Sequence, residues 1–360
     1  MFRRTLLAAG LAIAAVAAPA NAQQLTRLNV SMQPALYSMV PLHLGVEQGW
    51  WRQMGIEPNF SSFPAGPPQI AAAAAGTWDV GITGSAPGVL GAARFNIKTI
   101  AISNDESATN VLMARRDQVE AIRANPASLL GQRVLITVNT TVDYVLQNCL
   151  QRWNLQRADL QVVNLNQAQI LSAFSTGEGR IAGLWAPNIY TAEERMNAVP
   201  LCSGSDAQAI VPGNIIVREE FLARNPDMVA RYLAVILRGI AWMKANPGPT
   251  LEVMNRFYQA GGVTVSEAAL RAEVARRPIF GLEDQLRLLA RAGGPSQADR
   301  WFEGLSPSLH RSVQYKIHQR LRLLLPMRCC GGSQIIHSSV PLPWGSRELK
   351  GRGISSVLSP

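Results

Sequence analysis

The 360-residue chain has few of the side chains that carry out acid–base, redox or metal chemistry. It contains four histidines and four cysteines, and His43 is the only histidine before residue 310. Residues 23–304 contain no G-x-S-x-G nucleophile elbow, no phosphate-binding P-loop and no H-E-x-x-H helix. We therefore expect no catalytic residue, no metal and no cofactor.

Charged side chains are also scarce, at 16% of the chain, whereas apolar residues make up 48%. This balance favours a folded chain with a sizeable core over disorder. The formal net charge is +10, but it comes from the two ends, because residues 23–304 contain 24 basic and 23 acidic residues. A neutral body gives no support to binding of a polyanion, so we expect no nucleic-acid partner.

The first 22 residues have the pattern of a secretory signal. Arg3 and Arg4 precede the apolar run Leu6–Ala18, and Ala20-Asn21-Ala22 forms an A-x-A cleavage site. The apolar run is shorter than the roughly 20 residues that cross a bilayer. We expect residues 1–22 to be removed and the mature protein to be periplasmic.

Residues 305–360 differ abruptly in composition from the body. They carry eight Lys and Arg against the single acid Glu348, and no regular apolar period continues through them. One interpretation is a basic tail for an anionic surface. The interpretation we prefer is translation out of the original reading frame after about Gly304.

The body alternates strand-like and helix-like segments. The patterns predict strands at Leu25–Ser31, Glu57–Phe63, Val80–Thr83, Lys98–Ser103, Val111–Arg115, Arg133–Thr137, Leu160–Leu165, Ala182–Trp185 and Ile215–Arg218. They predict helices at Pro41–Gln53, Pro67–Ala75, Ser85–Arg94, Val142–Trp153, Ala168–Thr176, Pro226–Ala245, Pro249–Tyr258, Ser266–Ala275, Leu282–Ala292 and Ser296–Phe302. This alternation predicts an α/β fold with mostly parallel sheets covered on both faces.

The strand–helix series runs twice and ends with a return strand, which predicts two lobes. We expect 23–108 plus 213–304 to form lobe 1 and 109–212 to form lobe 2. The chain would cross near Asn104–Val111 and return near Val211–Asn214. A ligand would then bind between the lobes, at the loops that follow the strands.

The loops that follow the predicted strands are small, polar and neutral: Gln33–Ala35, Thr83–Pro87, Val138–Thr141 and Trp185–Asn188. Gly84 lets backbone approach a ligand closely, and Ser85, Thr140 and Thr141 offer hydroxyls beside unpaired helix N–H groups. Such loops can bind a small anion or a carbonyl-like oxygen without Lys or Arg. The alternative for any one loop is that its Ser or Thr is an ordinary helix N-cap.

Other side chains near these loops are apolar or acidic. Tyr37, Tyr144 and Trp185 could enclose an apolar ligand body, and Asp105-Glu106 would suit a ligand with a cationic group. The ligand itself stays open between a sulfonate, a pyrimidine and an amide. Cys149 and Cys202 either pair as a disulfide in an oxidising compartment or stay as two buried thiols.

Four stretches together resemble a known family. They are Pro41–Ile56, Gln69–Gly76 with Trp78–Ser85, Gly131–Val134 with Asn139-Thr140-Thr141, and Trp185-Ala186-Pro187. The second resembles the A-G-x-x-D-x-G block of the periplasmic substrate-binding proteins of ABC importers for nitrate, sulfonates and taurine. That family also includes thiamine-pyrimidine-synthase-like members, and the likeness covers about 25–300.

The resemblance implies a two-lobe venus-flytrap fold of type II. By position it places Gly84 and Ser85 at the ligand from lobe 1, and Thr140, Thr141 and Tyr144 from lobe 2, with Asn214 by the hinge. We also expect Tyr37, Asn139 and Trp185 to contact the ligand. It also implies a monomer that delivers a small solute to an ABC permease in the inner membrane.

Two other functions use the same fold. A thiamine-pyrimidine-synthase-like enzyme would need a cysteine-rich motif and an active-site histidine, which the body lacks. A periplasmic ligand sensor would need the same cleft as a transporter subunit, and the sequence does not separate these two roles.

Overall fold

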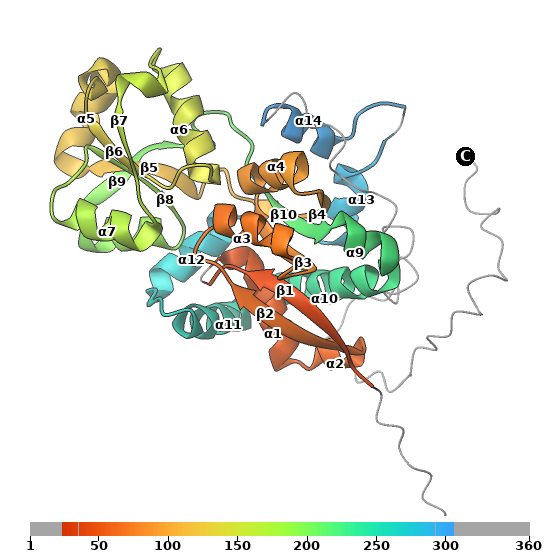
Figure 1. The fold of residues 1–360 in the computed structure, drawn as a ribbon. Coiled ribbons are helices and arrows are strands. Elements are labelled where there is room, and N and C mark those ends of the chain that lie inside the picture. The colour runs from red at the N-terminus through yellow and green to blue at the C-terminus, as the bar shows by residue number, and fades with distance from the viewer. Residues whose placement is uncertain (1–23, 35, 292, 306–360) are drawn as a thin grey trace, which may run out of the picture. The chain divides into compact units, whose positions relative to one another are not determined.

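The computed structural model describes residues 24–34, 36–291 and 293–305 (Figure 1). The expected signal segment 1–22 and, beyond Leu305, the expected tail 305–360 lie outside the described residues. The described part contains two five-stranded mixed sheets with helices packed against them.

The first sheet has the strand order β2-β1-β3-β10-β4. Its strands are β1 (Thr26–Met32), β2 (Ile56–Ser62), β3 (Val80–Gly84), β4 (Ile97–Asp105) and β10 (Pro212–Arg218). β1 pairs in parallel with β2 and β3, whereas the return strand β10 runs antiparallel to both β3 and β4. One antiparallel strand therefore sits inside an otherwise parallel sheet.

The second sheet repeats this plan in the order β7-β6-β8-β5-β9. Its strands are β5 (Asn110–Arg115), β6 (Arg133–Ile136), β7 (Gln161–Asn164), β8 (Ile181–Trp185) and β9 (Ala198–Ser203). β6 pairs in parallel with β7 and β8, and β5 runs antiparallel to β8 and β9. β9, one of the two edge strands, was not predicted, because Pro200 interrupts its strand pattern.

The helices cover the sheets. Their bounds are α1 Val40–Glu47, α2 Trp50–Gln53, α3 Gly66–Ala72, α4 Ser85–Arg94, α5 Arg116–Ala124, α6 Thr141–Arg152, α7 Gln167–Ser175, α8 Asn188–Arg195, α9 Glu219–Arg224, α10 Pro226–Ala245, α11 Pro247–Ala260, α12 Glu267–Arg276, α13 Leu282–Leu288 and α14 Gln297–Glu303. One helix expected over Pro41–Gln53 is broken into α1 and α2. Gly49 lies between them with a φ of 67°, which ends the helical path.

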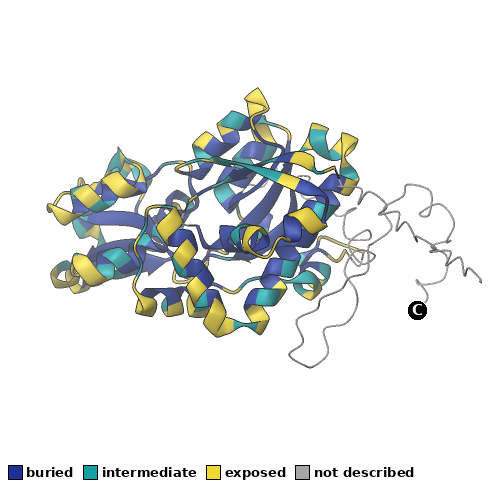
Figure 2. Cartoon of the chain, turned by 90° about the horizontal axis from the view of Figure 1, so that it is seen from below, coloured by how far each residue is buried: buried dark blue, intermediate teal, exposed yellow. Residues whose placement is uncertain are grey.

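The central element of the first core is α10. Leu233, Ile236 and Ile240 are at most 1% exposed and belong to the same apolar cluster as Leu28 and Val30 of β1. The buried strands and helix faces of both sheets are dark blue in Figure 2. We call the first sheet with its helices the first lobe, and the second sheet with its helices the second lobe.

Two segments carry the chain between the sheets. Residues 106–109 lead from β4 to β5, and residues 204–211 lead from β9 back to β10. The backbone N–H of Glu106 donates to the carbonyl of Val211 at 2.7 Å, so the two segments lie side by side. Within the second lobe, Cys149 of α6 and Cys202 of β9 form a disulfide, which resolves the alternative that the sequence left open.

Candidate ligand-binding site

A pocket lies where loops of the two lobes meet. Ten residues line it: Gln33, Leu36, Gly66, Gly84, Pro87, Glu106, Asn110, Thr140, Thr141 and Trp185. Its volume is about 20 Å³, which is room for about one water molecule. The lobes are therefore closed on each other here, and any larger solute requires them to move apart.

Two helices begin at this pocket, one from each lobe. Gly84 is the N-cap residue of α4 and Thr140 that of α6, and neither helix has a side-chain cap. The hydroxyl of Thr140 donates instead to the carbonyl of Thr137 at 2.6 Å. The first backbone N–H groups of both helices are thus available to a ligand, and they favour an anion or a partly negative oxygen.

Gly84 of the first lobe lies close to Thr141 of the second lobe. A Cβ placed on Gly84 would lie 2.1 Å from Oγ1 of Thr141, so in the closed arrangement a larger residue would have to displace the Thr141 hydroxyl. The φ of Gly84 is −70°, which any residue adopts, so the requirement comes from space alone. Thr141 itself is 5% exposed.

The structure brings four of the nine predicted site residues to the pocket wall: Gly84, Thr140, Thr141 and Trp185. Ser85 and Asn214 are fully buried beside it, behind the first turn of α4. The Ser85 hydroxyl and both amide atoms of Asn214 have no hydrogen-bond partner among the described residues. A Cβ on Gly88 of α4 would lie 2.2 Å from the Asn214 amide nitrogen, which places that amide under the helix.

The other three predicted residues do not line the pocket. Asn139 is exposed, and its backbone N–H donates to Oδ2 of Asp143 at 2.8 Å. The hydroxyl of Tyr144 faces the carbonyl of Gly304 at 3.4 Å. Tyr37 follows the pocket residue Leu36 but lines a different cavity.

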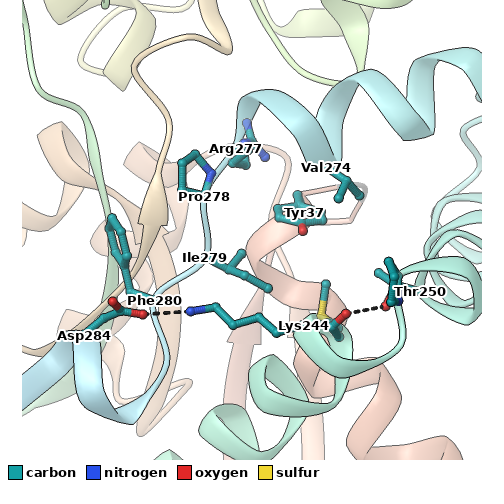
Figure 3. A pocket seen from close by; sticks show the side chains of 11 residues that line it. Tyr37, Lys244, Thr250, Val274, Arg277, Pro278, Ile279, Phe280 and Asp284 are labelled. Carbon is teal, nitrogen blue, oxygen red and sulfur yellow. Dashed lines mark hydrogen bonds and ion pairs between the residues drawn. The ribbon is translucent and has the colours of Figure 1, made fainter.

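That second cavity is larger, about 400 Å³, and Figure 3 shows its wall. It is lined by Tyr37, Met243, Lys244, Pro247, Thr250, Val274, Arg277, Pro278, Ile279, Phe280 and Asp284. Lys244 donates to Oδ2 of Asp284 at 2.8 Å, so its charge is already paired. The wall is otherwise mainly apolar, and apart from Tyr37 it comes from α10 to α13, not from the strand ends.

A buried charged cluster adjoins the cavity, because Arg277 belongs to both. Arg277 donates to Oε1 of Glu273 at 3.0 Å and to Oγ1 of Thr109 at 3.0 Å, and both charged side chains are 0% exposed. Tyr258 donates to Oε2 of Glu273 at 2.6 Å. The cluster ties α11 and α12 to the segment that connects the two sheets.

Burial and neighbouring charges set the pKa values in this cluster. Burial raises the pKa of Glu273, with the Arg277 charge acting against it. Burial alone would lower the pKa of Arg277, but the carboxylates of Glu106 and Glu273 outweigh it and raise that pKa. Burial, reinforced by Glu273, raises the pKa of Tyr37. Arg277 is therefore a cation over the whole physiological range.

The sequence analysis missed several of these residues. Gly66, Pro87 and Asn110 line the pocket but were not among the predicted site residues. Of these, Pro87 belongs to the predicted ligand loop Thr83–Pro87. No local sequence signal marks Glu273 and Arg277, because their cluster depends on contact with Thr109, more than 160 positions earlier in the chain. Glu106 was recognised as an acid near the crossing, but not as a pocket residue.

The chain is similar in sequence to known binding proteins. A Brucella abortus protein, named for binding without a stated ligand, is 26% identical over 309 residues, which cover 85% of this chain and 92% of that protein. The taurine-binding periplasmic protein of Escherichia coli K12 is 24% identical over 268 residues, covering 72% of this chain and 79% of that one.

Solved structures show the same fold. The alkanesulfonate-binding protein of Xanthomonas axonopodis pv. citri, bound to MOPS, superposes with a TM-score of 0.63 at 17% identity, over 80% of this chain and 98% of that one. The expected periplasmic-binding-protein fold is therefore confirmed. Among the described residues, no helix has the length and apolarity needed to cross a bilayer.

The family profile described as NMT1/THI5 like matches residues 37–249, which include both helix N-termini at the pocket. This match spans more than half of the chain, and the resemblance seen in the sequence is confirmed. The chain belongs to the NMT1/THI5-like family.

Proposed function

We propose that this protein captures a small anionic solute of the sulfonate, taurine or nitrate type between its two lobes. The observation that carries the proposal is the pair of uncapped helix N-termini, one from each lobe, at Gly84 and Thr140. Each lobe supplies backbone N–H groups that can donate to an oxyanion. The names of relatives that bind taurine and alkanesulfonate support the same class of solute.

Closure follows from this arrangement. A solute that contacts α4 and α6 together binds the closed form more tightly than the open form, and only such a difference drives closure. We propose that the closed form is then recognised by the permease of an ABC importer, with the binding protein acting as a periplasmic monomer.

The described residues offer little for catalysis at this pocket. His43, the only histidine among them, lies on α1 and pairs with Glu47 at 3.1 Å. Its ring also lies 5.6 Å from that of Phe257 on α11, at a tilt of 54°, and His43 does not line the pocket. Nothing at the pocket pairs a base with a nucleophile, and we propose a binding role instead of an enzyme of the thiamine-pyrimidine-synthase type.

Thermal melting of the purified protein with a panel of solutes tests the proposal. The panel holds taurine, alkanesulfonates, nitrate, aromatic carboxylates and aminopyrimidines. A bound solute at 100 times its Kd adds about 2.7 kcal/mol, which for a protein of this size raises Tm by roughly 5 °C. A shift with a sulfonate or nitrate supports the proposal, and a shift only with an aminopyrimidine or an aromatic carboxylate contradicts it.

A mutant pair locates the site. Thr141→Ala removes a pocket hydroxyl and is expected to weaken binding by about threefold to tenfold, the value of one neutral hydrogen bond. Thr176→Ala is the matched control, because Thr176 is an exposed residue at the end of α7 whose hydroxyl bonds only the carbonyl of Ala173. Equal affinities for the two variants would place the site elsewhere.

A further inference from the structure

One pocket residue does not suit a simple anion. Glu106 directly follows β4, lines the pocket and is only 3% exposed. Its carboxylate oxygens receive only long hydrogen bonds, from the amide of Asn104 at 3.3 Å and from that of Asn110 at 3.4 Å. A carboxylate this deeply buried is expected to have a cationic partner, because an unpaired buried charge is strongly unfavourable.

The described residues supply that partner only beyond ion-pair distance. Among them, no Lys, Arg or His nitrogen lies within the 4.0 Å that defines an ion pair with Glu106. Arg277 is the cation that the Glu106 carboxylate acts on, because Glu106 helps to raise the pKa of Arg277. Arg277 donates its direct hydrogen bonds to Glu273 and Thr109 instead. Glu106 and Glu273 thus share one guanidinium, and no cationic side chain among the described residues bonds Glu106 directly.

The backbone N–H groups at the N-terminus of α6 carry partial positive charge. A Cβ on Gly84 would lie 2.1 Å from Oγ1 of Thr141 and 3.9 Å from Oε2 of Glu106. The N-terminus of α6 and the Glu106 carboxylate are therefore close enough for one small molecule to touch both. The helix N-terminus favours the anionic end of such a molecule, and the carboxylate favours a cationic end.

We propose that the pocket selects a solute that carries an ammonium or similar cationic N–H group a short distance from its anionic group, with Glu106 as the acceptor for the cation. This inference rests on the proposed function, since it assigns the second half of the same ligand. It makes Glu106 a specificity-determining residue that distinguishes amino-substituted solutes from plain anions.

The neighbouring acid provides a matched control. Asp105 Oδ1 accepts hydrogen bonds from the backbone N–H of Ser107 at 2.8 Å and from its hydroxyl at 2.5 Å. Asp105 does not line the pocket and is engaged in this local turn. Removing its charge changes the electrostatics near the crossing without changing the pocket wall.

Isothermal titration calorimetry on the purified protein tests the inference with two matched pairs of probes. Taurine is compared with ethanesulfonate, and homotaurine with propanesulfonate, so that each pair differs only by the amino group. We expect the amino-substituted probe to bind about 30-fold more tightly in at least one pair, the value of a hydrogen bond to a charged group. Glu106→Gln is expected to abolish this preference, and Asp105→Asn to keep it.

The outcomes separate this inference from the proposed function. If the sulfonates bind without preference for the amino group, or Glu106→Gln leaves the preference intact, the inference is wrong and the solute-binding role stands. If Glu106 serves only as a counter-charge for Arg277, Glu106→Gln lowers Tm but keeps the ratio of affinities, which also overturns the inference. If none of the panel of solutes binds, both proposals fail.

Discussion

The contact between Gly84 and Thr141 allows a sharp test of lobe closure. In Gly84→Ala the new methyl group would lie 2.1 Å from Oγ1 of Thr141, whereas ordinary van der Waals contact begins at 3.4 Å. The two must separate by roughly 1 Å, either by partial opening of the cleft or by rotation of the Thr141 side chain. Both changes disturb the atoms that would hold the solute.

The cost of such overpacking is about 1–3 kcal/mol. Because the clash exists only when the lobes are closed, it reduces the affinity for the solute instead of the stability of the open form. We expect Gly84→Ala to weaken binding by about 10- to 100-fold. Its unfolding free energy without ligand should change by less than about 1 kcal/mol, the scale of an N-cap substitution.

Calorimetric titration of four proteins provides the assay: wild type, Gly84→Ala, Thr141→Ala and the double variant. Removing Oγ1 relieves the clash, because the Cβ of Thr141 lies 3.4 Å from the added methyl. Gly84→Ala should therefore cost less than about twofold in the Thr141→Ala background. Gly248→Ala is the control, since no atom lies within 4 Å of its added Cβ. Additive losses, or no loss in Gly84→Ala, would refute the closed contact.

Two further predictions concern stability. Glu47 accepts two hydrogen bonds of 2.9 Å from Arg256, and these bonds lower the pKa of Glu47 from its usual 4.5. The ion pair should add about 0.5 kcal/mol to the unfolding free energy above pH 4.5, and this contribution is lost as the pH falls through the lowered pKa. In acid melts, Glu47→Gln should therefore lose less stability than wild type, whereas the exposed control Glu57→Gln should lose as much as wild type. Equal losses for Glu47→Gln and wild type would contradict the assignment. Reduction of the Cys149–Cys202 disulfide should lower the unfolding free energy by about 2–4 kcal/mol, measured by melting with and without dithiothreitol; an unchanged Tm would show that the bond does not contribute.

Much of the fold could be predicted because local patterns and tertiary structure agree. The helices Ser85–Arg94 and Pro226–Ala245 have the same bounds in the structure as in the sequence analysis. Elements with weak apolar patterns were missed. α9 has no buried residue, so periodicity gives no signal for it. α5 is amphipathic but mainly polar, and its short apolar stripe consists of Val119 and Ile122.

The site was harder to predict than the fold. The strand-to-helix loops locate Gly84, Thr140 and Thr141, because α/β topology brings such loops to one edge. The direction of a side chain within a connecting segment depends on contacts distant in sequence. Asp105 turns to Ser107 whereas Glu106 lines the pocket, and the backbone there is held by bonds from Asp105 to Pro278 and from Glu106 to Val211, both more than 100 positions away.

The central claim is that the solute lies between the lobes and not in the larger cavity beside Lys244. A crystal structure of the protein grown with the solute that gives the largest rise in Tm tests this claim most directly. The account predicts one solute molecule with its anionic group at the backbone N–H groups of Ser85 and Thr141. A solute bound instead in the cavity lined by Tyr37 and Lys244, with the pocket at Gly84 unoccupied, would contradict it.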